Sequence, residues 1–416
     1  MSLRFTIIAI ILLAAEVYSF ILVRSVLRTV PSPGRGWLLA LYLLLTVMAW
    51  VCIPLFRKLG WGHFPNAFRN ITIAFTIGLT IGKLLMLAIM AFDDVRRLFL
   101  LLATRYFPAS QAALPIPDGE GITRSVFLKR LALLLGGLSI TGFVYGITNR
   151  YQYRVRRVKL HFNNLPSSFR GMKMVQISDI HSGSFDNKEA VQKGIDLILQ
   201  EQPDILFFTG DLVNDRAVEM KPYISMFGQL TAPLGVYATL GNHDYGDYAS
   251  WNSPEEKQQN LEALKSMHGA MGWRLMMNEH IVLEKGTDKI AIIGIENWSD
   301  KAHFPKYGDM AKAYNGLPEK NVPFQILLSH DPSHFDAQVI SQYPDIDLTL
   351  SGHTHGMQFG VEIPGWKWSP SQFVYKKWAG LYQYGKQHLY VNRGFGFLGY
   401  PGRLGILPEI TVFELT

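Results

Sequence analysis

Cysteine and charge are both scarce in this chain of 416 residues. Its single cysteine, Cys52, excludes a disulfide framework and any zinc or iron–sulfur site built from cysteines. Charged residues make up only 18% of the chain, whereas apolar and aromatic residues make up 48%. This balance is too apolar for an ordinary soluble globule and excludes disorder. The composition therefore indicates that part of the chain lies in a membrane.

The positive charge is confined to the first third of the chain. The net charge is +7, but residues 1–150 hold 15 Lys/Arg and 5 Asp/Glu, whereas residues 151–416 hold 25 and 28. The first part is thus +10 and the second −3. A nucleic-acid-binding domain is expected to carry a broad cationic surface, so no nucleic-acid partner is expected for the second part.

Residues 1–150 contain apolar runs long enough to cross a hydrocarbon core of about 30 Å as helices. A buried soluble helical bundle is the alternative, and four such runs in 150 residues disfavour it. The short run Leu98–Phe107 is expected to lie at the membrane interface instead. We predict a transmembrane region over 1–150 with about four helices, at 5–23, 37–56, 71–92 and 126–147.

Two ionisable residues, Glu16 and Lys83, fall inside the first and third of these runs at similar depth. An isolated charge inside a membrane costs about 3 kcal/mol on insertion scales, so such residues usually pair or line a pathway. The pattern predicts a Glu16–Lys83 ion pair that fixes helix packing.

Membrane orientation is predicted from the loops. Loops 24–36 and 93–130 lie on one side and hold nine Lys/Arg, whereas the other side holds four. Because cytoplasmic loops are enriched in Lys/Arg, the second domain is predicted to be extracytoplasmic. If the basic cluster 150–159 were part of a loop, its five Lys/Arg would make the two sides equal. The enrichment rule, however, largely exempts translocated domains, to which this cluster would belong.

Residues 151–416 alternate short β-type runs with amphipathic helices, which is typical of an α/β domain. The Pro/Gly-rich stretch 108–121 before it is predicted to be a loop. Helices are expected over 187–200 and 254–268. Strands are expected near 158–162, 173–177, 205–208, 236–240, 290–295, 324–328 and 348–350.

Five of these strands are followed directly by His, Asp or Asn. Open α/β sheets place their sites at the carboxyl ends of strands. Carboxylate, imidazole and amide ligands without thiolate suit Mn, Fe, Zn or Mg. Seven ligand-type positions are too many for one tetrahedral ion and suit two ions that share a carboxylate. The segments are Asp179–His181, Gly210–Asn214, Gly241–Asp244, His330–Asp331 and Gly352–Gly356.

In this order, the motifs DxH, GDxxN, GNHD, SHD and GHTHG resemble those of the calcineurin-like metallophosphoesterases. The likeness covers about 250 residues and is greatest to a bacterial branch with membrane-anchored, phosphodiesterase-like members. Met357 stands where that branch commonly has a second glycine. The resemblance implies a four-layer α/β/β/α sandwich, here preceded by the four-helix transmembrane region.

The resemblance also implies a role for each matching residue. His243 is expected to be catalytic, donating a proton to the leaving oxygen or stabilising the transition state, with Asp244 orienting it. Apart from the resemblance, Arg393 and Arg403 are candidate contacts for a substrate phosphate, whereas Asp331 and His334 lie near a ligand and are expected to be structural supports. Two divalent ions, with manganese among the choices, are expected on Asp179, His181 and His355 for the first, Asn242, His330 and His353 for the second, and Asp211 bridging both.

The predicted function is a membrane-anchored dinuclear phosphoesterase acting on a phosphodiester, phosphomonoester or pyrophosphate, in a lipid-linked substrate. The stretch 366–378 combines Trp, Tyr and Lys, as at a lipid headgroup interface, although core packing would explain it equally well. One alternative is a phosphatase of soluble phosphates that uses the membrane only as a tether. The other is a membrane sensor or transporter whose domain binds phosphate ligands without turnover.

Overall fold

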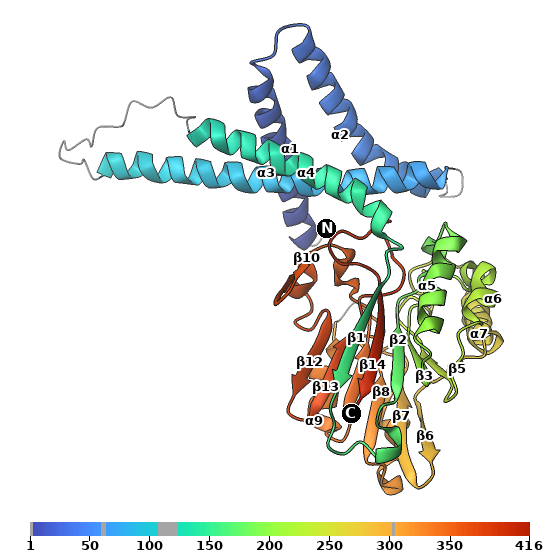
Figure 1. The fold of residues 1–416 in the computed structure, drawn as a ribbon. Coiled ribbons are helices and arrows are strands. Elements are labelled where there is room, and N and C mark those ends of the chain that lie inside the picture. Colours follow the sequence, from blue (N-terminus) through green and yellow to red (C-terminus); the bar gives the residue numbers. More distant parts are fainter. Residues whose placement is uncertain (1–2, 60–63, 107–123, 302–303) are drawn as a thin grey trace. The chain divides into compact units, whose positions relative to one another are not determined.

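The computed structural model describes residues 3–59, 64–106, 124–301 and 304–416 (Figure 1). The chain forms two compact units, Met1–Ile147 and Thr148–Thr416. The predicted loop 108–121 lies outside the described residues.

The first unit consists of long apolar helices. Each is long and apolar enough to cross a membrane, so the number of candidate spans is the four predicted. They are α1 (Leu3–Leu27), α2 (Gly34–Leu59), α3 (Asn66–Tyr106) and α4 (Arg124–Gly146).

Helix α3 corrects one expectation, because the run from Leu98 is not a separate interfacial segment but the end of this 41-residue helix. No glycine or proline interrupts the chain between Lys83 and Tyr106. In addition, Asp93 pairs with Arg96 and Arg97, each at 2.8 Å, and such i,i+3 and i,i+4 pairs stabilise a helix.

The predicted ion pair inside the membrane region is confirmed. Nζ of Lys83 lies 2.6 Å from Oε2 of Glu16 and donates a second hydrogen bond to Thr46 at 2.9 Å. The indole of Trp50 donates to the other Glu16 oxygen at 2.9 Å. Both charges are therefore compensated, and the cluster joins α1, α2 and α3.

The second unit contains two six-stranded mixed sheets and one hairpin. The first sheet has the order β1-β14-β2-β3-β4-β5 and the second β12-β13-β9-β8-β7-β6, while β10 and β11 pair only with each other. The strands are β1 (Arg154–Leu160), β2 (Lys173–Ile177), β3 (Ile205–Thr209), β4 (Val236–Thr239), β5 (Arg274–Leu275), β6 (Glu279–Lys285), β7 (Asp288–Gly294), β8 (Phe324–Leu328), β9 (Leu348–Ser351), β10 (Val361–Ile363), β11 (Trp366–Trp368), β12 (Gly380–Tyr384), β13 (Gln387–Val391) and β14 (Glu409–Leu415).

Three buried apolar clusters separate four layers, so the predicted α/β/β/α sandwich is confirmed. The central cluster joins the two sheets, with Phe207 and Phe413 from the first meeting Ile326 and Leu350 from the second. The other two clusters lie between each sheet and its helices. These helices are α5 (Lys188–Gln200), α6 (Ile224–Phe227) and α7 (Pro254–Ala270) on the first sheet, and α8 (Met310–Tyr314) and α9 (Ile340–Gln342) on the second. Figure 1 shows α5, α6 and α7 beside the first sheet.

Candidate metal centre

The predicted ligands converge where the carboxyl ends of the central parallel strands meet. Strands β2, β3 and β4 run parallel in the first sheet, and β8 and β9 run parallel in the second. Each strand is followed by its polar motif within three residues, so the sandwich brings side chains from both sheets together. The residues are Asp179, His181, Asp211 and Asn242 from the first sheet, and His330, His353 and His355 from the second.

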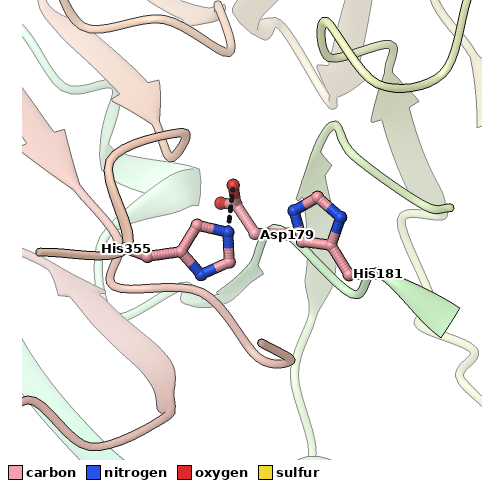
Figure 2. A group of neighbouring side chains, drawn as sticks. All are labelled: Asp179, His181 and His355. Atoms are coloured by element: carbon pink, nitrogen blue, oxygen red, sulfur yellow. Dashed lines mark ion pairs between the residues drawn. The ribbon is translucent and has the colours of Figure 1, made fainter. Parts of the chain in front are cut away.

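One group consists of Asp179, His181 and His355, whose ligand atoms lie within 4.8 Å of one another. Figure 2 shows the three side chains, with Nε2 of His355 3.3 Å from Oδ1 of Asp179. His181 is fully buried, yet neither of its ring nitrogens has a hydrogen-bond partner, and Nε2 of His355 has no hydrogen bond besides its ion-pair contact with Asp179. A buried polar atom without a partner is costly, so these nitrogens fit a bound cation.

The second group consists of Asp211, His330 and His353. Nδ1 of His330 lies 2.6 Å from the Thr209 carbonyl, which leaves Nε2 to face the group, 3.3 Å from Nδ1 of His353. Oδ1 of Asn242 lies 2.8 Å from the same His353 nitrogen, so the amide oxygen joins this group as the fourth donor.

Asp211 lies next to both groups. Its Oδ2 is 3.5 Å from Nε2 of His181 and 3.2 Å from Nε2 of His330. Its Oδ1 accepts the backbone N–H of His243 at 2.9 Å, which fixes the orientation of the carboxylate. The donor set as a whole, carboxylate, imidazole and amide without thiolate, fits divalent ions of the Mn, Fe, Zn or Mg kind.

The backbone at the site is strained. Ten non-glycine residues of the described chain have positive φ, and half of them are predicted ligands. A left-handed conformation costs roughly 1 kcal/mol or more for such residues, and strain of this kind concentrates at functional sites. The five are Asp179 (φ 53°), His181 (49°), Asp211 (62°), His353 (71°) and His355 (49°).

The electrostatics of the site follow from its dense burial. Burial alone would disfavour charge on Asp179 and Asp211, but His355 and His330, respectively, hold the pKa of these carboxyls below the usual range. Burial likewise opposes charge on His330, yet Asp211 and Asp179 raise its pKa to about 10. Both carboxylates therefore keep their charge although buried, as cation binding requires, and an ion bound at Nε2 of His330 would replace the proton held there.

His243 and Asp244 are both at the site, but the contact predicted between them is wrong. Nδ1 of His243 lies 2.6 Å from the backbone carbonyl of Asn214, and that carbonyl orients the ring. The Asp244 carboxylate instead accepts backbone N–H groups of Asp211, Leu212 and Gly241 at 2.7–2.9 Å. Asp244 therefore ties together the two loops that carry Asp211 and Asn242.

The expectation that Arg393 and Arg403 contact substrate is also corrected. Arg393 is 2% exposed and bound to Glu409 and Glu362, at 2.5 and 2.7 Å. Arg403 is fully buried and donates to the carbonyls of Arg393 and Gly396. Neither guanidinium is free for an anionic ligand, because each is already engaged inside the domain.

Asp331 and His334 are supports, as expected. His334 lies between Ser329 and Gln338, and Asp331 accepts the Tyr375 hydroxyl at 3.0 Å. The motifs gave no indication of this role for Tyr375, because it stands 20 residues after the last motif ligand, His355, in the aromatic stretch 366–378. The cavity in front of the ligands measures about 190 Å³, and Phe304, Met357, Tyr375 and Leu398 line it together with them.

Comparison with known proteins agrees with this architecture. Residues 172–357 match the family described as "Calcineurin-like phosphoesterase", and residues 3–150 match "Probable Calcineurin-like phosphoesterase, transmembrane domain". The chain is 32% identical over 304 residues to the uncharacterized metallophosphoesterase YkuE of Bacillus subtilis, covering 71% of this chain and 98% of that one.

Two further relatives are of different length. A zebrafish (Danio rerio) transmembrane protein with metallophosphoesterase domain is 32% identical over 278 residues, which cover 64% of this chain but only 59% of the relative. The UDP-2,3-diacylglucosamine pyrophosphatase LpxG of Chlamydia muridarum is 28% identical and is matched over 56% of this chain and 81% of its own length.

A four-layer sandwich with clustered Asp, His and Asn at its strand ends defines a metal-dependent phosphoesterase, here with a membrane region. The chain belongs to the calcineurin-like metallophosphoesterases, hydrolases of phosphoric esters, and carries their four-helix transmembrane domain.

Proposed function

We propose that the second unit hydrolyses a phosphoester with the help of two divalent ions. The observation that carries this proposal is the position of Asp211, whose single Oδ2 atom lies within 3.5 Å of a histidine in each ligand group. One ion would be held by Asp179, His181 and His355, and the other by Asn242, His330 and His353. Bound there, the ions would supply an activated water and neutralise charge on the phosphoryl oxygens.

His243 is proposed as the general acid. Its Nδ1 donates to the Asn214 carbonyl, so Nε2 is the nitrogen that exchanges a proton. His243 lines the cavity beside the ligands, and its ring centre is 5.0 Å from that of His181. From this place a protonated Nε2 would donate to the leaving oxygen as the bond to phosphorus breaks.

The substrate is proposed to be a phosphodiester, phosphomonoester or pyrophosphate of a lipid-linked molecule. The wall of the cavity supports this, because Phe304, Met357 and Leu398 are apolar and adjoin the ligands. The four membrane helices and the name of the chlamydial relative agree with an amphipathic substrate.

We further propose that the catalytic domain is extracytoplasmic, because segments 24–36 and 93–130, predicted to lie on the opposite side, hold nine Lys/Arg against four on its own side. Alkaline phosphatase and green fluorescent protein fused after Thr416 test this in bacterial cells. The alkaline phosphatase fusion is expected to be active and the green fluorescent protein fusion to lack fluorescence. An inactive phosphatase fusion together with a fluorescent one would overturn the proposed orientation.

The decisive experiment measures metal content and hydrolysis of the full chain in detergent. Bis(p-nitrophenyl) phosphate and p-nitrophenyl phosphate report diester and monoester cleavage. Wild type is expected to hold two ions per chain and to be active. Asp211→Asn should lose at least one ion and a thousandfold or more of the rate, whereas Asp196→Asn on α5 should change neither. Binding of phosphate without hydrolysis of either ester would favour the sensor alternative.

A further inference from the structure

An unusual share of exposed apolar surface lies directly after the last metal ligand. The described part of residues 148–416 has eleven exposed large hydrophobic side chains, and six of them fall within the eighteen residues 357–374. A concentration of this kind marks an interaction site. We call these six the apolar lip: Met357, Val361, Ile363, Trp366, Phe373 and Val374.

The β10–β11 hairpin carries part of the lip. It exposes apolar side chains and turns charged side chains towards the protein, the opposite of a hairpin that faces water. Ile363 pairs with Trp366 across the turn, and both are more than half exposed. The next pair, Glu362 and Lys367, points the other way. Glu362 binds Arg156 at 2.6 Å and Arg393 at 2.7 Å, and Lys367 donates to the Ala379 carbonyl. The charged pair thus anchors the hairpin, and the apolar pair faces outward.

The lip is continuous with the cavity of the metal centre. Met357 belongs to both, and its backbone is held at φ 50°, a conformation that glycine adopts more easily. Its side chain is 47% exposed, so core packing does not offset the strain. Met357 therefore extends the exposed apolar surface to the cavity.

The chain enters the domain beside the same cavity. Asn149 donates to the Arg403 carbonyl at 3.2 Å, and the ring of Tyr151 packs on Phe397. The segment 397–404 that receives these contacts contributes Leu398 to the cavity and pairs with Gly360 through the Leu404 carbonyl. Only seven residues, 147–153, separate α4 from β1, a reach of about 25 Å at full extension.

We propose that the apolar lip rests on the lipid bilayer and guides a membrane phosphoester into the cavity. The short connection keeps a bilayer within reach, and Trp366 with the exposed Lys376 gives the composition of a headgroup contact. Delivery of substrate by the lip rests on the proposed function, whereas contact with lipid does not.

Contact is tested in the full chain in lipid nanodiscs, with Cys52→Ser removing the native thiol. Nitroxide labels are placed by Ile363→Cys, Trp366→Cys and, as a matched exposed control, Tyr384→Cys. At the two lip positions, relaxation by an aqueous nickel chelate should fall at least fivefold below the control while relaxation by oxygen rises. Equal accessibility at all three positions would overturn the proposal. So would protection that appears only when two chains share a disc, because the lip would then join two copies.

Delivery is tested in proteoliposomes with two diesters that share one leaving group, hexadecyl p-nitrophenyl phosphate in the vesicles and ethyl p-nitrophenyl phosphate in solution. The double variant Ile363→Ser and Trp366→Ser should slow the hexadecyl ester at least tenfold and the ethyl ester less than twofold. Tyr384→Ser should affect neither. Equal slowing of both esters, or of neither, would refute delivery. If wild type cleaves neither diester, the phosphodiester part of the proposed function fails and delivery of a diester fails with it, and the nitroxide result still decides whether the lip contacts lipid.

Discussion

The hydroxyl of Tyr375 lies 2.8 Å from Nε2 of His353 and 3.0 Å from Oδ2 of Asp331. Burial and Asp331 raise the pKa of the Tyr375 phenol far above its usual range, so the phenol stays protonated and donates to the carboxylate. It must then accept from Nε2–H of His353, which leaves Nδ1 of that ring free to face Asn242 and His330. Asp331 and Tyr375 therefore select the ring nitrogen that His353 offers to a metal.

Tyr375→Phe is expected to weaken metal binding, because partners of this kind typically contribute 10–100-fold to affinity. Titration with Mn²⁺, followed by calorimetry, should show one of two binding steps weakened by about that factor. Tyr237→Phe removes a hydroxyl that bonds the Leu234 carbonyl away from the ligands, and should leave both steps unchanged. Equal affinities in the two variants would show that the Tyr375 contact does not position His353.

His243→Asn separates proton transfer from metal binding. The ring is not among the ligand groups, and only its backbone N–H contacts Asp211. We expect kcat to fall about 10²–10⁴-fold, the usual contribution of general acid–base catalysis, at unchanged metal content. Elemental analysis and hydrolysis of bis(p-nitrophenyl) phosphate provide both measurements. Loss of metal together with activity would instead assign His243 a role in holding an ion.

The clustering of the predicted ligands could be foreseen because each follows an apolar strand within a short motif. Parallel strand order brings such ends to one edge of each sheet, and the packing of the two sheets brings the two edges together. The strands β2 and β8 matched their predicted bounds. Contacts made across the fold were not predictable. Arg393 has no visible partner in the sequence, since Glu362 and Glu409 lie 31 and 16 residues away. Asp244 is adjacent to His243 in the chain, but the turn directs its carboxylate towards the backbone of another loop.

His268 on α7 is expected to make stability depend on pH. It is fully buried, its Nδ1 lies 3.0 Å from the Leu264 carbonyl and its Nε2 has no partner. Burial lowers the pKa of His268 to about 4. Below the unfolded value of about 6.5, the unfolded chain binds a proton that the folded chain does not, so stability falls as pH drops from about 6.5 towards 4.

At pH 5 this effect amounts to about 2 kcal/mol. His268→Leu should therefore gain about 2 kcal/mol of unfolding free energy relative to wild type between pH 7.5 and pH 5, measured by urea unfolding of the full chain in detergent. His161→Leu changes an exposed histidine and should follow wild type at both pH values. The same pH dependence in wild type and His268→Leu would contradict the assignment.

Packing of α3 against α4 depends on glycine at the point of closest approach. A Cβ atom on Gly82 would lie 2.9 Å from the carbonyl oxygen and 3.1 Å from Cα of Gly136, both backbone atoms that cannot move independently. Close approach of this kind through small residues holds membrane helices together. Gly82→Ala should therefore force the helices apart at a cost of about 1–3 kcal/mol, seen as a Tm several degrees lower in detergent. Gly137 offers the matched control, because a Cβ there meets nothing within 4 Å. Because alanine is the better helix former, Gly137→Ala should leave Tm unchanged or raise it, and an unchanged or raised Tm in Gly82→Ala as well would show that close packing does not require glycine at position 82.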